Sequence, residues 1–157
     1  MRGRWRNIVI FLALGVISIA GHAQKLNGVR SVGILVEEVD QDAASCGISK
    51  DGIDAAIRIP ISNSRLVISN SPPGVPYVYA QVTVLKLGNG GCVGSIHLEL
   101  NRFVWLAPGA RQLESQIAAV WGRSSVVAGL PTNFPRIAGN MIEDMTKLLI
   151  AAWLKDN

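Results

Sequence analysis

The chain has 157 residues, of which 49% are hydrophobic and 17% charged, and its 15 basic and 11 acidic residues give a formal net charge of +4. Three of the basic residues, Arg2, Arg4 and Arg6, precede a short apolar run, so 12 basic residues face 11 acidic ones in the rest of the chain. These charges are scattered singly, which argues against a nucleic-acid-binding protein, because nucleic acid requires a clustered basic face.

Residues 1–23 have the pattern of a secretory signal peptide. A basic start is followed by the apolar residues 8–20 and by Gly21 and Ala23, the small residues of a cleavage site. The apolar run is shorter than the roughly 20 residues that a helix needs to cross a bilayer. We therefore expect residues 24–157 to form a single periplasmic or secreted domain with no stable membrane span. An uncleaved anchor is the alternative.

Cys46 and Cys92 are the two cysteines of the chain. In an exported protein, such a pair most simply forms one disulfide bond. Two free thiols or a redox pair are the alternatives, but a catalytic redox pair usually has the spacing Cys-x-x-Cys, which is absent here.

The first elements are predicted from local patterns in chain order. A strand is predicted over residues 31–39, a loop over residues 40–47 and a short helix from residue 50 to about residue 57. Ser49 is in the N-cap position of this helix, and Pro60 is expected to end it. A short strand is predicted over residues 65–69.

A β-hairpin over residues 76–106 is the strongest local signal. The turn sequence GNGG at residues 88–91 separates two arms in which aliphatic residues alternate with polar and aromatic ones. One face is therefore predicted to pack on a core and the other to be partly wet. Arg102 interrupts the aliphatic face, so a bulge or the sheet edge is expected there. A phosphate loop is the alternative for the glycines, but the required lysine and following helix are missing.

A last strand is predicted over residues 112–128, and a last helix begins after Thr132 or Asn133. The apolar residues of this helix recur at steps of three and four, as in a helix that packs on a sheet. The order β-α-β-β-β-β-α predicts an α+β fold: a two-layer sandwich with two helices on an antiparallel sheet of about five strands.

The outer face of the hairpin is the candidate binding surface. Four aromatic residues are expected on the side opposite the aliphatic core: Tyr77, Tyr79, Phe103 and Trp105. An exposed apolar patch usually marks a surface for a partner or a ligand. The alternatives are that both faces are partly covered, or that the aromatic residues lie at opposite rims.

Signals for catalysis are sparse. His97 is the single histidine outside the leader, and Glu99 shares its strand face, so the two form a conceivable acid–base pair. Motifs of serine hydrolases, zinc peptidases and dinucleotide-binding proteins are missing. Asp40 and Asp42 are conceivable calcium ligands, but they lack the spacing of a calcium loop. We expect no enzyme activity, no metal and no cofactor.

With this order of elements, the chain resembles small bacterial envelope proteins, namely the lipopolysaccharide-assembly lipoprotein and the auxiliary lipoproteins of envelope ABC transporters. The resemblance covers nearly all of residues 24–157 as an order of elements and includes no residue motif. The chain departs from both families because no lipobox cysteine follows its apolar run. The resemblance implies a binding or scaffolding role.

We therefore expect an exported accessory module of the cell envelope, whose partner is an envelope protein or a lipid-like ligand. The alternative is a small secreted hydrolase or transferase that uses His97 and Glu99. A stress-related structural protein without a specific ligand is a third possibility.

Overall fold

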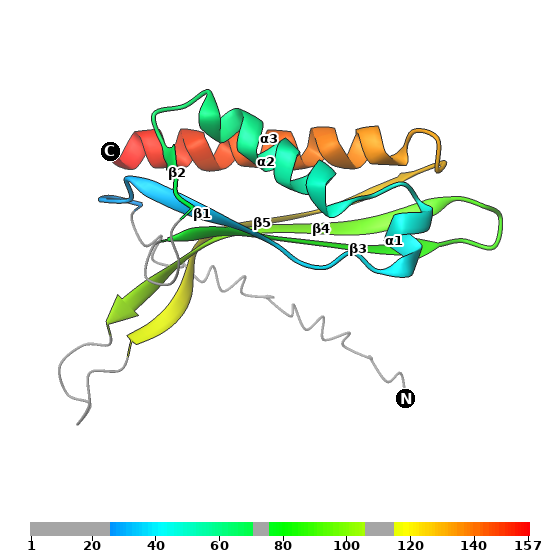
Figure 1. Cartoon of the computed structure of the whole chain (residues 1–157), viewed down its shortest axis with the longest axis horizontal. Coiled ribbons are helices and arrows are strands. Elements are labelled where there is room, and N and C mark those ends of the chain that lie inside the picture. Colours follow the sequence, from blue (N-terminus) through cyan, green and yellow to red (C-terminus); the bar gives the residue numbers. More distant parts are fainter. Residues whose placement is uncertain (1–25, 71–75, 106–114) are drawn as a thin grey trace, which may run out of the picture.

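The computed structural model describes residues 26–70, 76–105 and 115–157, which form a five-stranded sheet and three helices (Figure 1). The α+β class predicted from the sequence is confirmed. The expected signal peptide and the turn at Pro72 and Pro73 lie outside the described residues. Within the described ranges, no helix has both the length and the apolar character that crossing a membrane requires.

The sheet has the strand order β2-β1-β3-β4-β5. Its strands are β1 (Ser31–Val36), β2 (Val67–Ile68), β3 (Tyr77–Lys86), β4 (Cys92–Trp105) and β5 (Ser115–Gly129). Strands β3, β4 and β5 pair in antiparallel fashion and contain most of the sheet.

The sheet is mixed, so the prediction of a purely antiparallel sheet is wrong in this detail. Strand β1 runs parallel to both of its neighbours, with Ser31 opposite Val67 on β2 and Ile34 opposite Val78 on β3. The connection from β1 to β2 contains a helix that carries the chain back to the end where it started, and such a crossover joins parallel strands.

The predicted hairpin of β3 and β4 is confirmed, with Lys86 opposite Cys92. Gly90 has a φ of 84°, a conformation that glycine adopts without steric cost, and the N–H of Leu87 donates to the carbonyl of Gly91 at 2.8 Å. The aliphatic residues of both arms are buried: Val78, Ala80, Val82, Val84, Ile96, Leu98 and Leu100.

A bulge lies close to the place where Arg102 predicted an irregularity. Leu100 pairs with Trp121, whereas Asn101 pairs with Ala119, so Val120 on β5 has no partner on β4. The extra residue on β5 changes which of its residues share a face from this point on.

Helices α2 (Lys50–Ser62) and α3 (Phe134–Asp156) cover one face of the sheet (Figure 1). Helix α2 continues through Pro60, so its predicted end near residue 57 is wrong. Pro60 and Ile61 are both buried. Burying such side chains is favourable by about 1.5–3 kcal/mol each, which offsets the cost of a proline in the last helical turn. The short helix α1 (Gln41–Ser45) occupies part of the predicted loop.

At Gly94, the aromatic ring of the first residue of α3 lies close to the backbone of the sheet. A Cβ atom on Gly94 would lie 2.9 Å from Cζ of the fully buried Phe134. A glycine on β4 therefore creates the space in which the first residue of α3 is anchored. At the other end of α3, Trp153 Nε1 donates to the carbonyl of Val29 at 2.6 Å.

Candidate functional site

The face of the sheet opposite α2 and α3 is the candidate binding surface, and we call it the outward face (Figure 1). Strand alternation and register place these side chains on it: Leu35, Glu37, Tyr77, Tyr79, Gln81, His97, Glu99, Asn101, Phe103, Ile117, Ser124 and Val126. Asn101 is the buried one among them. Helices of the described chain leave this face uncovered.

Three of the four predicted aromatic residues lie on the outward face with half-buried side chains. Tyr77 and Tyr79 are two residues apart on β3, and Asn101 lies opposite Tyr77. Phe103, two residues beyond Asn101, is therefore a diagonal neighbour of Tyr77. Trp105 pairs with Ser115 along the backbone, and its side chain lies outside the described residues. The role of these aromatics in binding stays a prediction.

Aliphatic side chains extend this surface to both sides of the aromatic residues. Leu35 on β1 is 51% exposed, Ile117 on β5 is 55% exposed and Val126 on β5 is 71% exposed. The sequence analysis did not select these residues, because their position on the outward face depends on how β1 and β5 pair with the hairpin.

A hydrogen-bonded group on the outward face joins β1 to β3. The phenol of Tyr79 donates to Glu37 Oε1, and Gln81 Nε2 donates to Glu37 Oε2 at 2.8 Å. The hydrogen bond to Glu37, reinforced by burial and by the negative charges of Glu37 and Glu99, raises the pKa of Tyr79 from 10.0 to about 12. The phenol of Tyr79 therefore stays protonated to a higher pH than that of an ordinary tyrosine.

A second polar group lies across β4 and β5. His97 Nδ1 is 2.6 Å from Ser124 Oγ, and His97 Nε2 is 2.8 Å from Glu99 Oε1. Asn101 Nδ2 donates to Glu99 Oε2 at 3.4 Å. The predicted pairing of His97 with Glu99 is observed, whereas Ser124 was missed, because only the register of β4 and β5 reveals that it lies opposite His97.

A hydroxyl, an imidazole and a carboxylate in a row are the groups that serine hydrolases use for nucleophilic catalysis. Such catalysis also requires donors that stabilise an oxyanion. The backbone of His97 lies in the middle of the sheet, paired with Gln81 on one side and Ser124 on the other. The backbone N–H of His97 is therefore used in pairing with a neighbouring strand and does not serve as such a donor. The hydrogen bonds of this row of Ser124, His97 and Glu99 also link side chains of β4 and β5, so the row has a structural role as well.

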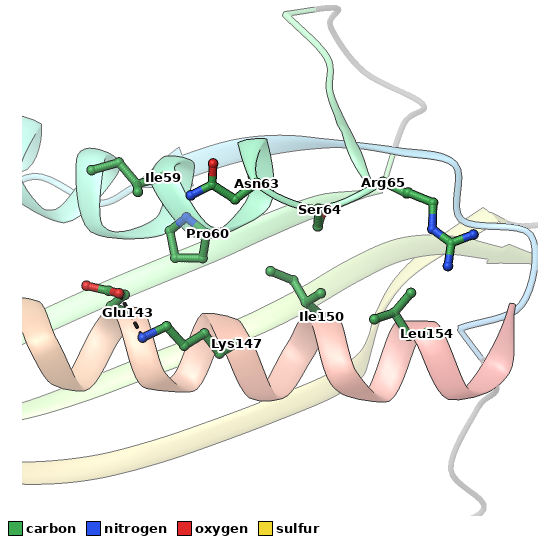
Figure 2. A pocket seen from close by; sticks show the side chains of 9 residues that line it. All are labelled: Ile59, Pro60, Asn63, Ser64, Arg65, Glu143, Lys147, Ile150 and Leu154. Atoms are coloured by element: carbon green, nitrogen blue, oxygen red, sulfur yellow. Dashed lines mark ion pairs between the residues drawn. The ribbon is translucent and has the colours of Figure 1, made fainter.

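The helical layer carries a groove of about 510 Å³ between the second half of α2 and the second half of α3 (Figure 2). It is lined by Ile59, Pro60, Asn63, Ser64, Arg65, Glu143, Lys147, Ile150 and Leu154. The sequence analysis gave no signal for it, because its two walls are far apart in the chain.

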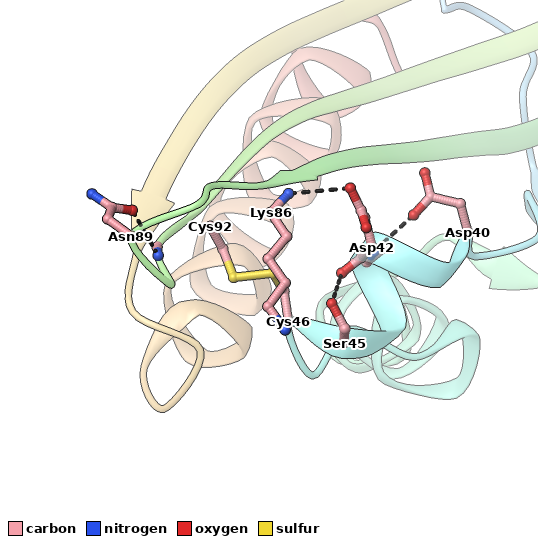
Figure 3. Close-up of a disulfide and its surroundings, with 9 residues drawn as sticks. Asp40, Asp42, Ser45, Cys46, Lys86, Asn89 and Cys92 are labelled. Atoms are coloured by element: carbon pink, nitrogen blue, oxygen red, sulfur yellow. Dashed lines mark hydrogen bonds between the residues drawn. A yellow bond between two sulfur atoms is a disulfide. The ribbon is translucent and has the colours of Figure 1, made fainter.

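The disulfide bond predicted between Cys46 and Cys92 is present and joins the end of α1 to the start of β4 (Figure 3). Asp40 accepts a hydrogen bond from the N–H of Ala43 at 2.7 Å, and Asp42 accepts one from the N–H of Lys86 at 3.3 Å. The two carboxylates considered as calcium ligands thus cap α1 and tie it to β3. Across the described residues, no three His, Cys, Asp or Glu side chains are grouped as metal ligands.

No protein family matches the chain, and no curated protein matches its sequence. Among solved structures, a PelC dodecamer from Paraburkholderia phytofirmans is similar, with 15% sequence identity and a TM-score of 0.41, over 74% of this chain and 82% of that chain. A minor lipoprotein from Acinetobacter baumannii is similar with 6% identity and a TM-score of 0.41, over 78% of this chain and 89% of that chain. The functional proposals below rest on the chemistry of the outward face and of the groove.

Proposed function

We propose that the protein is an exported accessory module of the bacterial cell envelope that binds a partner protein on the outward face of its sheet. The observation that carries this proposal is the set of aromatic and aliphatic side chains on a face that no described helix covers. Exposed apolar side chains are costly to leave in water, and a patch of them on a monomeric protein usually marks an interaction site.

Two features support export. The sequence of residues 1–23 has the pattern of a signal peptide, and Cys46 and Cys92 form a disulfide bond. Disulfide bonds persist in oxidising compartments such as the periplasm and are rare in the cytosol.

The composition of the outward face is that of a surface that binds another protein. Tyr77 and Phe103 are the aromatic residue types that are enriched at protein interfaces, and Ile117 adds exposed aliphatic area beside them. Glu37 and Glu99 place hydrogen-bonded carboxylates next to this apolar area. An apolar centre with polar groups around it is the usual anatomy of an interface.

The outward face is a better candidate for the partner-binding surface than the edge of the sheet. Strand β5 is the longer of the two edge strands of the described sheet, and an exposed edge can pair with a strand of another protein. The unpaired Val120 interrupts its regularity, and Arg123, opposite the buried Leu98, puts a charge on the helix-covered side of the sheet. Bulges and inward charges are features that prevent edge pairing.

The proposal is tested by replacing Tyr79 and Phe103 together with serine. The full chain is expressed with a tag in its own host, purified gently from the envelope and examined by native mass spectrometry. We expect a second protein to accompany the unaltered chain and to be lost from the double variant. Leu148→Ser is the matched control, because Leu148 is 52% exposed on α3, away from the outward face. If the double variant remains folded and retains the partner, the outward face is not the binding surface.

The row of Ser124, His97 and Glu99 favours a second candidate function, that of a small hydrolase or transferase. In this case, Ser124 would react with a fluorophosphonate probe, and His97→Ala would abolish the reaction because the base is gone. Labelling at Ser124 that depends on His97 would support catalysis. A folded protein that the probe does not label at Ser124 would leave the row with its structural role.

A further inference from the structure

We propose that the groove between α2 and α3 is a second binding site, which takes a single-chain amphiphile with an anionic head group. Its position on the helical layer, opposite the outward face, makes it independent of the function proposed above. The inference rests on the volume of the groove, on its apolar side chains and on the cations at one of its ends (Figure 2).

The apolar side chains along the groove suit an alkyl chain. Ile59 and Pro60 of α2 lie on one side, and Ile150 and Leu154 of α3 lie on the other. Ile59 is 58% exposed and Leu154 is 46% exposed, so a bound chain would remove apolar surface of both from water. The volume of about 510 Å³ is within the range of sites for small molecules, which is roughly 300–1,000 Å³.

The two ends of the groove differ in charge. At one end, Lys147 Nζ is 2.8 Å from Glu143 Oε1 and 3.4 Å from Asp144 Oδ1, so its charge is compensated. At the other end, Arg65 makes no ion pair with any residue that the structure describes. A single anionic group is therefore attracted to the Arg65 end.

A second arginine lies beside the same end. An adjoining cavity of about 350 Å³ shares Arg65 and Leu154 with the groove and is also lined by Arg30, Trp153 and Asn157. Arg30 likewise has no ion pair with a described residue. Two guanidinium groups around one space suit a carboxylate or a phosphate, because each offers a planar fork of N–H donors.

The parallel pairing of β1 and β2 explains why the two arginines line the same cavity. Ser31 pairs with Val67, and the N–H of Val67 donates to the carbonyl of Arg30 at 3.2 Å. Arg30 and Arg65 thus come just before the starts of two neighbouring strands that run in the same direction. The end of α3 places about half a negative charge nearby, and Asp156 adds a carboxylate that accepts from the N–H of Leu26 at 2.8 Å. The two arginines carry more positive charge than these two sources of negative charge together.

Isothermal titration calorimetry on the full chain tests the proposal with dodecanoate as the probe, below its micelle concentration. Dodecyltrimethylammonium supplies the same chain with a cationic head, and acetate supplies the carboxylate without the chain. We expect dodecanoate to bind at one site, at least tenfold more tightly than either control probe. Tighter or equal binding of dodecyltrimethylammonium would refute the anionic head, and equal binding of acetate would refute the role of the chain.

Matched variants locate the site. Arg65→Gln should weaken dodecanoate binding about tenfold. The control is Arg58→Gln, which should not change dodecanoate binding, because Arg58 also lies in the helical layer but is bonded to Asp54. Leu154→Ser should weaken binding several-fold. Leu148→Ser should leave binding unchanged, because Leu148 is a similarly exposed leucine of α3 that lies outside the groove. If Arg65→Gln and Leu154→Ser bind as the unaltered protein does, dodecanoate binds elsewhere and the proposal is wrong. Loss of dodecanoate binding in these variants with the partner protein still bound would separate this site from the outward face.

Discussion

The hydroxyl oxygen of Ser124 lies 2.6 Å from Nδ1 of His97, across the pairing of β5 with β4. Glu99 occupies the other nitrogen of the same ring. His97 is thus held on both sides within the surface to which we assign partner binding. The same register brings Val126 and Ile117 onto the outward face, one on each side of this row.

The proton of neutral His97 is predicted to reside on Nε2. The carboxylate of Glu99 only accepts hydrogen bonds, so Nε2 must donate, and Nδ1 then accepts from Ser124. Because His97 is the single histidine outside residues 1–23, one set of imidazole signals in a two-bond ¹H–¹⁵N NMR spectrum reports the tautomer. Ser124→Ala should shift the Nδ1 signal toward that of a free acceptor nitrogen. A proton on Nδ1 in the folded protein would contradict this geometry.

Tyr79 is predicted to titrate well above an ordinary tyrosine, since its hydrogen bond to Glu37 raises its pKa from 10.0 to about 12. Tyr77 and Tyr79 are the two tyrosines of the chain, so Tyr77→Phe leaves a single phenol to follow by absorbance at 295 nm. Adding Glu37→Ala should lower the pKa toward 10.0. Titration near 10.0 in the folded Tyr77→Phe protein would disprove the bond.

The same shift has a consequence for stability at alkaline pH. A phenol whose pKa is higher in the folded than in the unfolded state stabilises the fold below pH 10, and this contribution is lost as the pH rises from 10 to about 12. The unaltered protein should therefore lose more stability across this window than Tyr79→Phe, as urea denaturation at each pH would measure. An equal loss in both proteins would mean that Tyr79 is not coupled to folding.

Removing the disulfide bond is predicted to destabilise the protein strongly. Cys46 and Cys92 are 46 residues apart, and closing such a loop is worth about 4 kcal/mol in the chain-entropy model. Replacing both cysteines with alanine should lower the free energy of unfolding in urea by this order and the Tm by roughly 10 °C or more. A reducing agent should lower the Tm of the unaltered chain and leave that of the double variant unchanged. Equal effects on both would mean that the thiols are not joined.

Gly94 and Gly139 are predicted to respond in opposite directions to replacement by alanine. The new Cβ at Gly94 would lie 2.9 Å from the ring of Phe134, and overpacking of this kind costs about 1–3 kcal/mol. Gly139, within α3, has no atom within 4 Å of the added Cβ, so alanine should stabilise the helix by roughly 0.5–1 kcal/mol. Two changes of the same sign in urea denaturation would contradict the packing of α3 on β4.

Local sequence patterns were sufficient to predict those features of the fold that depend on residues close together in the chain. The period-two alternation placed Tyr77, Tyr79 and Phe103 opposite the buried aliphatic residues of the same strands, because successive side chains in a strand point to opposite faces. The cysteine pair and the cap at Ser49, which accepts a hydrogen bond from Gly52 N–H at 3.1 Å, also follow from short-range signals.

Features that depend on pairing or tertiary packing could not be predicted in this way. The parallel direction of β1, which creates the contact between Glu37 and Tyr79 and brings Arg30 to Arg65, follows from the crossover and not from any residue pattern. Helix α2 passes Pro60 because burial against the rest of the protein outweighs the local preference.

Site-specific photo-crosslinking in the living host tests the outward face most directly. A photoreactive residue in place of Ile117, which is 55% exposed on β5, should give a discrete adduct with one envelope protein. The same residue in place of Leu148, which is 52% exposed on α3, should give none. An adduct at Leu148 alone, or no adduct at Ile117 in a folded and exported protein, would contradict partner binding on this face.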